Sequence, residues 1–418
     1  ESILKLLALL GLKGAASTIT YFRDTLDADS QEGILKQISA LKKISCGADF
    51  HKPYTLRILE LPIDDTLKAH VFEKAILLEN LDEGSVEHHK LKSWIQTFIR
   101  IPFGKMKEFP VSLAKDGEDV CRHYLQKSLS RLNNVTYGMD SAKLQIMQLL
   151  CQWVSNPSAT GTAISLHGPM GTGKTTLIKE GVSTVLGRDF VFVPLGGATD
   201  SSFLDGHSYT YEGSTYGKII QGLKTCGSMN PIFFFDELDK VSDTPKGQEI
   251  IGVLTHLTDP SQNDMFFDKY FSDVSVDLSR ALFFFSYNDE TKINPILLDR
   301  MYKIKTKGYN SEEKSQICRK FLIPKILAKI GVSPEEINFG DEAIMTIIES
   351  SREEGVRCLK RSLETVVSKL NLVRLMGNNN CSVQIKTSEA RFPIEVTSAI
   401  VKKLIDSKPT EVWRNLYI

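Results

Sequence analysis

The sequence predicts an α/β protein in which a parallel sheet core lies between a mostly helical N-terminal region and a helical lid domain. Segments of helical pattern separate four short apolar runs that lack polar alternation: residues 163–166, 190–193, 232–235 and 281–285. Such runs are typical of strands buried on both faces of a parallel sheet. A glycine-rich loop follows the first run and precedes a helical segment. This order fits the first strand–helix unit of the sheet.

The chain before this core is expected to fold in two parts. Residues 1–62 form a mixed N-terminal segment, with a short helical stretch over 3–12 and a strand over 56–61. Over residues 63–134, apolar side chains recur at three- and four-residue spacing, and a polar turn interrupts them at 82–85. This spacing predicts an α-helical hairpin followed by a linker region.

The core and the segments after it are expected to form three further parts. Residues 135–305 carry the apolar runs and should form the large α/β subdomain. The pattern after it is helical again, which predicts a small helical lid subdomain over 306–385. Residues 386–418 are left as a C-terminal tail.

Composition narrows the class of protein. Hydrophobic residues make up 42% and charged residues 24% of the 418, which is ordinary for a globular protein. Lys+Arg and Asp+Glu both number 51, and this neutral balance argues against nucleic acid as a partner. No apolar run reaches the length of a membrane span. The seven scattered cysteines include no C-x-x-C pair, which favours free thiols in a reducing intracellular compartment.

The glycine-rich loop has the full G-x-x-x-x-G-K-[ST] pattern of a P-loop. It comprises Gly168, Pro169, Met170, Gly171, Thr172, Gly173, Lys174 and Thr175, and Thr176 follows it. Its glycines let backbone N–H groups close around phosphates, and the following helix N-terminus favours anionic charge. Lys174 is predicted to reach the β- and γ-phosphates and Thr175 to ligate Mg²⁺. The motif therefore predicts that the chain binds ATP and Mg²⁺.

Two later strands end in polar residues that suit hydrolysis of the nucleotide. The run 231–235 is followed by Asp236 and Glu237, which is the Walker B pattern. We expect Asp236 to hold Mg²⁺ through water and Glu237 to orient and polarise the attacking water. Asn288 follows the run 281–285, and its amide is a candidate to hydrogen-bond the same water, the sensor-1 role.

Around these motifs, the sequence resembles the ATPase module of Lon proteases, which are AAA+ proteins. The resemblance is strong over residues 137–375 and weaker upstream, over 94–104. It rests on the segments Leu195-Gly196-Gly197, Gly206-His207, Gly217-Lys218, Asp236-Glu237-Leu238-Asp239-Lys240, Asp259-Pro260-Ser261-Gln262-Asn263, Leu297-Leu298-Asp299-Arg300-Met301, Gly308-Tyr309 and Gly355-Val356-Arg357.

The resemblance implies roles for residues outside the nucleotide motifs. Arg300 resembles the arginine finger that reaches a neighbouring subunit's ATP site, and Arg357 the sensor-2 arginine of the lid. Tyr137 and Gly138 fall where the family packs the adenine. Because a finger in trans needs a neighbour, the resemblance implies a homo-oligomer, with a hexameric ring as the expected form.

The resemblance also implies a protein substrate. Tyr211 stands at the family's pore-loop aromatic, which grips a translocating polypeptide. The sequence departs from the family around it, because Glu212 replaces an aliphatic residue and Ser208-Tyr209 replace two arginines. A carboxylate beside the gripping ring makes the pore wall more polar, which points to a weaker apolar grip or a specialised client.

Three interpretations remain open. Lon proteins carry a C-terminal Ser-Lys peptidase domain, and the residues after the lid are too few to build one, so we expect no proteolytic site in this chain. The first interpretation is a peptidase-free unfoldase or remodeller, with a possible separate protease or adaptor as partner. The second is the ATPase portion of a true Lon protease whose peptidase domain is not in this chain. The third is a Lon-like scaffold or nucleic-acid-associated ring, against which the neutral charge speaks.

Overall fold

The computed structural model describes residues 16–46, 52–157, 161–211, 213–376 and 392–406. The helical stretch expected over 3–12 and the pore-loop residue Glu212 lie outside these ranges. The chain divides into two compact units, of which the first comprises Glu1–Lys107, Asp205–Met229 and Phe267–Ser275, and the second the remaining segments. None of the helices in the described ranges is long and apolar enough to cross a membrane.

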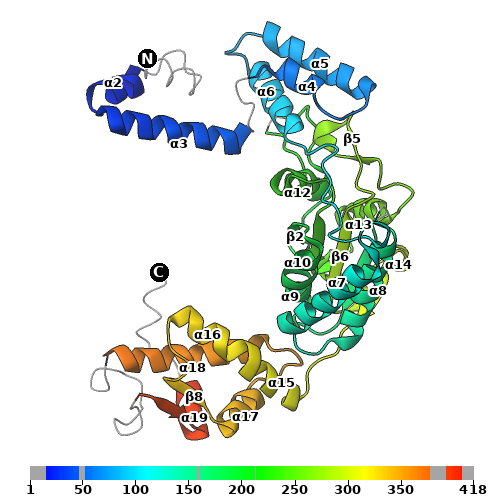
Figure 1. Ribbon diagram of the computed structural model, residues 1–418. Coiled ribbons are helices and arrows are strands. Elements are labelled where there is room, and N and C mark those ends of the chain that lie inside the picture. Colours follow the sequence, from blue (N-terminus) through cyan, green and yellow to red (C-terminus); the bar gives the residue numbers. More distant parts are fainter. Residues whose placement is uncertain (1–15, 47–51, 158–160, 212, 377–391, 407–418) are drawn as a thin grey trace. The chain divides into compact units, whose positions relative to one another are not determined.

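The first unit is mostly helical (Figure 1). Its described helices are α2 (Ala16–Asp24), α3 (Ala28–Cys46), α4 (Tyr54–Leu59), α5 (Asp65–Asn80), α6 (Val86–Ile99) and α12 (Lys218–Cys226), with a 3₁₀ turn, η3, at Lys269–Phe271. Asp64 caps α5 by accepting from the Thr66 backbone N–H, and Ser85 caps α6 by accepting from that of His88. The α5–α6 pair is the helical hairpin that the apolar spacing predicts.

The strand predicted over 56–61 is wrong, because this segment forms α4. Ile58 is fully buried, whereas Leu56 and Leu59 are exposed. This is the one-sided burial of a short helix, which begins directly after Pro53. A brief apolar run cannot be assigned to strand or helix by periodicity alone.

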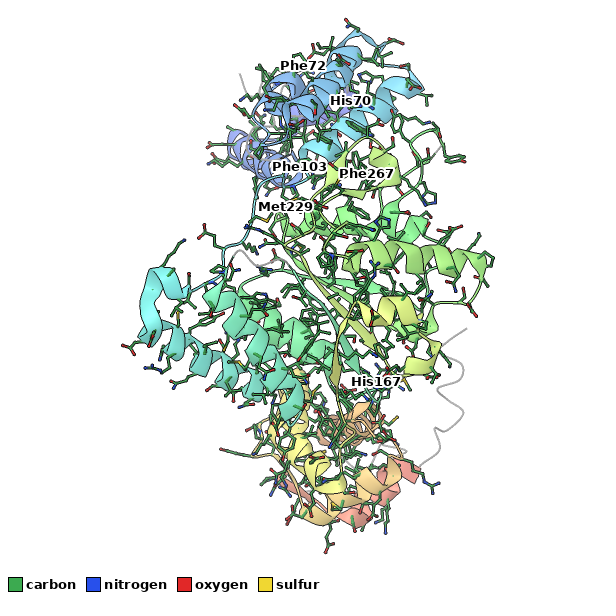
Figure 2. All side chains as sticks on the ribbon, turned by 90° about the vertical axis from the view of Figure 1, so that its right-hand side faces the viewer. His70, Phe72, Phe103, His167, Met229 and Phe267 are labelled. Atoms are coloured by element: carbon green, nitrogen blue, oxygen red, sulfur yellow. The ribbon has the colours of Figure 1, made fainter. Side chains whose placement is uncertain are left out.

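Aromatic packing joins the segments of this unit that are distant in sequence. Trp94 stacks on Phe98 at 5.4 Å between ring centroids and lies 5.2 Å from Phe271. The Met229 backbone N–H donates to the Lys105 carbonyl at 2.8 Å. Figure 2 shows Met229 close to Phe103, whose ring lies 5.1 Å from that of Phe98.

The second unit contains a five-stranded parallel sheet in the order β2-β3-β6-β1-β7. Its strands are β1 (Ala163–His167), β2 (Phe190–Pro194), β3 (Ile232–Asp236), β6 (Leu282–Tyr287) and β7 (Tyr302–Lys305). A separate pair joins β4 (Phe266–Phe267) and β5 (Ser275–Val276). The four apolar runs are strands, as predicted. The sequence missed β7, where Ile304 is the only buried side chain.

Helices surround this sheet and supply its core. They are α7 (Leu113–Val135), α8 (Asp140–Ser155), α9 (Lys174–Thr176), the π-helical stretch η1 (Leu177–Val182), α10 (Ser183–Leu186), α11 (Ser202–Asp205), α13 (Pro245–Thr258) and α14 (Pro295–Asp299), with 3₁₀ turns η2 (Leu238–Lys240) and η4 (Glu290–Lys292). Leu132 and Ile146 pack with Phe234 and Phe284 of the sheet in one buried cluster. This cluster fixes the strands whose ends carry the polar motif residues.

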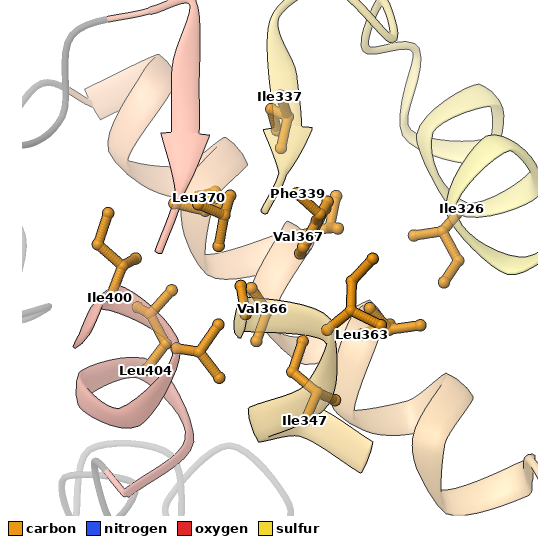
Figure 3. Packing of buried hydrophobic residues seen from close by; sticks show 14 of the residues in the cluster. Ile326, Ile337, Phe339, Ile347, Leu363, Val366, Val367, Leu370, Ile400 and Leu404 are labelled. Carbon is orange, nitrogen blue, oxygen red and sulfur yellow. The ribbon is translucent and has the colours of Figure 1, made fainter. Parts of the chain in front are cut away.

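The lid is a helical subdomain with its own core (Figure 3). It comprises α15 (Ser311–Ile317), a π-helical stretch η5 (Cys318–Leu322), α16 (Ile323–Ile330), β8 (Ile337–Phe339), α17 (Asp341–Ser350), α18 (Arg357–Met376), β9 (Ile394–Val396) and α19 (Ser398–Asp406). β9 pairs with β8, and Ile400 and Leu404 of α19 enter the lid core. The described lid therefore continues beyond the boundary at residue 385 that the sequence predicts.

Candidate active site

A pocket of about 600 Å³ lies within the second unit, between the carboxyl edge of the sheet and the lid. Its lining includes twelve of the site residues predicted from the sequence: Tyr137, Met170, Gly171, Thr172, Gly173, Lys174, Thr175, Thr176, Asp236, Glu237, Asn288 and Arg357. Gly138, Gly168 and Pro169 adjoin this set in sequence, but they are not among the lining residues. Parallel strands end at one edge, and this brings together motifs that are distant in sequence.

The P-loop follows β1 and has a conformation that its glycines permit. Gly171 has φ 76° and Gly173 φ 97°, in the left-handed region where side chains cause strain. A Cβ at Gly171 would lie 3.1 Å from the Arg357 backbone nitrogen, and the Val356 N–H donates to the Gly171 carbonyl at 3.1 Å. The first residues of the lid helix α18 therefore touch the P-loop directly.

Lys174 is the buried cation of the pocket, with 7% of its surface exposed. Its ammonium donates to the Asn288 Oδ1 at 2.9 Å, to the Tyr287 carbonyl at 3.3 Å and to the Gly168 carbonyl. Burial lowers the lysine pKa to about 8, and the nearby Asp236 and Asp239 oppose that shift. Within the described ranges its hydrogen-bond acceptors are neutral oxygens, so none of these direct contacts is an ion pair and the buried ammonium can bind an anion in the pocket.

Asp236 stands at the end of β3 and is held in place by the neighbouring strand. Its Oδ1 accepts hydrogen bonds from the Ser286 hydroxyl and, at 3.1 Å, from the Glu237 backbone N–H. Ser286 lies on β6 and lines the pocket. Ser286 was not singled out from the sequence, although a polar residue directly after the apolar run 281–285 is a usable signal. Carboxylate and hydroxyl oxygens at this position suit Mg²⁺ and its bound water.

Glu237 has a strained backbone, with φ 59° and ψ 45°. A non-glycine residue in the left-handed region costs free energy, and such residues cluster at functional sites. Its carboxylate lies against Gly196, where a Cβ would be 2.3 Å from the Glu237 Oε2. The glycine at 196 therefore leaves the room that this carboxylate occupies.

Tyr309 closes the pocket on the side of Tyr137. Its hydroxyl lies 2.7 Å from the Thr172 carbonyl and 3.1 Å from the Tyr137 carbonyl. Burial raises the pKa of Tyr309 to about 12, so the hydroxyl keeps its proton and donates. Gly138, with φ 61°, turns the chain beside this ring. The sequence interpretation used Tyr309 only as part of the resemblance and gave it no role.

The two predicted arginines lie in different places. Arg357 lines the pocket, whereas Arg300, which follows α14, does not. The Arg300 Nη1 donates to the Asp259 Oδ2 at 2.6 Å and to the Thr255 carbonyl at 3.1 Å. A hydrogen bond from Ser261, and then the charge of Arg300, hold the pKa of Asp259 below its usual value. This contact fixes the guanidinium away from its own chain's pocket.

Tyr211 belongs to the first unit and lies on the segment 206–217, where its side chain is 67% exposed. Its N–H donates to the Ser208 carbonyl at 3.1 Å, and its carbonyl accepts from the Ser214 N–H at 3.3 Å. These two bonds hold the Tyr211 backbone, and its ring remains exposed.

The fold and the pocket together define a P-loop ATPase. In agreement, residues 164–309 match the family described as "ATPase family associated with various cellular activities (AAA)". The chain is 36% identical over 351 residues to a Lon protease homolog of Acanthamoeba polyphaga mimivirus, an alignment that covers 80% of this chain and 34% of that protein. It is 33% identical over 358 residues to a Lon protease of Chlamydia pneumoniae, with 85% and 42% covered.

A Lon protease of Aquifex aeolicus is 34% identical over 331 residues, with 78% of this chain and 38% of the relative covered. The chain thus spans between about a third and under half of the length of these relatives. The matched part of the chain is an AAA-type ATPase module that is similar to the corresponding part of Lon proteases.

Proposed function

We propose that this chain hydrolyses ATP with Mg²⁺ and uses the energy to pull on protein substrates as a ring. The buried ammonium of Lys174, facing a pocket that also holds Asp236, Glu237 and Asn288, is the observation that carries the proposal. It supplies the charge that a polyphosphate needs, beside carboxylates suited to Mg²⁺ and to the activation of water.

Each side chain then has a definite task. ATP-Mg²⁺, when bound, supplies a phosphoryl group that water can attack. Lys174 binds the phosphate charge, Thr175 and Asp236 hold Mg²⁺, and Glu237 orients and polarises the water. Asn288 hydrogen-bonds the same water through its side-chain amide. Its Oδ1 accepts from the Lys174 ammonium at 2.9 Å, which holds this side chain in the pocket.

Arg300 acts on the pocket of an adjacent subunit. Its own chain holds the guanidinium outside its own pocket through Asp259 and the Thr255 carbonyl. An arginine fixed in this manner is suited to serve a neighbour, and it loses little side-chain entropy on doing so. We therefore propose a homo-oligomeric ring, with the hexamer that the Lon resemblance implies.

Tyr211 grips the substrate. The ring is exposed on a surface segment of the first unit, whereas every residue of the pocket lining belongs to the second. Stacking of a tyrosine on an extended polypeptide is not sequence-selective, which suits a general translocase. Tyr137 and Gly138 would pack the adenine, and Arg357 would report nucleotide occupancy to the lid.

We propose further that residues 1–418 hydrolyse no peptide bond. A Ser-Lys dyad needs a desolvated lysine beside a serine hydroxyl. The buried lysines of the described residues are Lys143, Lys174 and Lys314, and their ammonium groups donate to carbonyl and amide oxygens. The relatives are Lon proteases that extend well beyond the matched part, which favours a second interpretation: this chain is the motor portion of such a protease.

A cleavage assay tests this part of the proposal. Purified chain, ATP-Mg²⁺ and a fluorogenic unfolded protein should give phosphate release without cleavage. Cleavage that survives repurification and stops with a serine-directed covalent inhibitor would reveal a peptidase site in this chain. Cleavage that needs a second added protein would support a motor that serves a separate protease.

The nucleotide roles are tested by binding and turnover of the same variants. Lys174→Ala should lose ATP binding, because the phosphates lose their buried cation. Glu237→Gln should bind ATP with wild-type affinity yet hydrolyse it slowly, because the amide cannot polarise water. Lys179→Ala is the matched control, an exposed lysine in the same helical stretch. Equal loss of affinity in Lys174→Ala and Glu237→Gln would refute the assigned roles.

A further inference from the structure

Asp268 is a fully buried acid that the proposed chemistry does not use, with 0% of its surface exposed. It lies in the first unit, just before the 3₁₀ turn η3. Its two oxygens accept hydrogen bonds from backbone N–H groups of different segments: Oδ2 from Gly217 at 2.8 Å and Oδ1 from Tyr270 at 2.9 Å. Burying a carboxylate is costly, and two oriented donors offset part of that cost.

The same carboxylate touches the other end of the segment that carries Tyr211. Gly206 has φ 79°, and a Cβ there would lie 2.6 Å from the Asp268 Oδ1. Gly206 and Gly217 are the first and last residues of the segment 206–217, and we call them its two roots. Just inside them, the His207 N–H donates to the Thr215 carbonyl at 2.9 Å and joins the two ends of the segment. Asp268 therefore contacts both roots at the point where they approach each other.

Tyr270 extends this support along the segment. Its ring meets those of Tyr209 and Tyr216 edge to face, at 5.8 and 6.1 Å between centroids. Its carbonyl accepts from the Trp94 Nε1 of α6 at 3.0 Å. The tyrosine at 209, where the Lon resemblance leads one to expect an arginine, thus packs against Tyr270.

We propose that Asp268 is a positioning residue for substrate translocation: it fixes both roots of the segment 206–217 and so holds Tyr211 at a constant place. This inference rests on the proposed role of Tyr211. A gripping ring transmits force only if its base is rigid, and a buried acceptor that hydrogen-bonds the Gly217 root and lies against the Gly206 root contributes to that rigidity.

The charge state of the anchor is sensitive to its surroundings. Burial raises the pKa of Asp268 to about 7, and the nearby Asp205 adds to this rise. The N–H groups of Gly217 and Tyr270 and the charge of Lys269 act in the opposite direction. Lys269 is itself ion-paired with Asp205 at 2.9 Å. The carboxylate accepts at both oxygens, whereas a protonated oxygen is a donor and accepts less well from the N–H of Gly217 or of Tyr270.

Hydrogen–deuterium exchange of the full chain tests the anchor without any use of the motor activity. In Asp268→Asn, one of the two backbone donors loses its acceptor, so exchange at Gly217 or Tyr270 should be about ten- to a hundredfold faster. Peptides from the P-loop should keep wild-type exchange. Asp273→Asn, an exposed acid five residues further on, is the matched control. Gly206→Ala strains a left-handed backbone and pushes a methyl group toward the Asp268 Oδ1 and the Gly217 nitrogen, so it perturbs both roots and should speed exchange at Gly217 in case the Asn variant does not fold.

The functional readout is the ratio of substrate-stimulated to basal ATP turnover. This ratio should fall severalfold in Asp268→Asn at unchanged basal rate. Wild-type exchange at both Gly217 and Tyr270 in Asp268→Asn would overturn the positioning role. Faster exchange with an unchanged turnover ratio would show that Asp268 holds the segment but does not affect translocation. The role proposed for Tyr211 would then be wrong.

Discussion

Replacement of Gly196 by Ala is a one-methyl perturbation of the proposed general base. Gly196 has no positive φ, so alanine fits its backbone, and the added Cβ would meet the Glu237 Oε2 at 2.3 Å. The next two atoms it would meet, Cδ and Cβ of Glu237, are at 3.4 and 3.6 Å, which are ordinary contacts. The clash therefore falls on the end of the Glu237 side chain.

The size of the effect follows from this distance. A carbon and an oxygen in contact need about 3.2 Å, so the carboxylate must move by roughly 1 Å. A displacement of that size in a group that positions the reacting water costs about a hundredfold in rate. ATP affinity should be unchanged, because the proposed function assigns binding of the phosphates to Lys174 and the P-loop backbone and not to Glu237. Gly196→Ala should thus resemble a weaker form of Glu237→Gln.

The assay compares kcat and ATP affinity of Gly196→Ala with those of Gly197→Ala. A Cβ at Gly197 meets nothing within 4 Å, so this neighbour carries the same chemical change without the clash. A drop in kcat for position 196 alone, at equal ATP affinity, is the expected result. Equal kcat in the two variants would refute the reasoning that Glu237 is held in place by the space at Gly196.

Two further predictions concern residues outside the P-loop. Arg300→Ala should lower kcat by about 10³- to 10⁵-fold, and mixing it with Lys174→Ala should partly restore turnover; absence of rescue with verified subunit exchange would exclude a shared site. The neutral form of Asp268 is favoured in the fold, so the folded chain binds more protons than the unfolded chain between pH 3.8 and about 7. Wild-type stability should therefore fall by a few kcal/mol across that interval. The melting temperature of Asp268→Asn relative to wild type should rise over the same interval and level off above it. A difference that is independent of pH would mean that Asp268 does not titrate in this way.

The sequence predicts those parts of the fold whose pattern is visible within a few consecutive residues. The strands β1, β2, β3 and β6 are continuous apolar runs, and their polar ends meet because parallel strands finish at one edge. The strand predicted for the α4 segment is wrong because a short apolar run has no distinctive period. β7 was missed because it is an edge strand with a single buried side chain.

The contacts that position the site residues could not be predicted, because they join residues distant in sequence. Nothing local indicates that Asp259 holds Arg300, or that Gly196 leaves room for Glu237. The extension of the lid beyond residue 385 depends on Val396, Ile400 and Leu404, which show their partners only once β9 pairs with β8. Asp268 stands in the sequence between Phe267 and Lys269, like many surface acids, and its burial is a property of the fold.

The rate of ATP turnover with and without an unfolded polypeptide, in wild type and Tyr211→Ala, tests the central claim most directly. Tyr211 is exposed and belongs to the unit that does not contain the pocket. We expect equal basal rates in the two proteins and stimulation by the polypeptide in the wild type that Tyr211→Ala loses. Equal stimulation of both proteins would remove Tyr211 from the mechanism, and a wild type without any ATP turnover would contradict the account altogether.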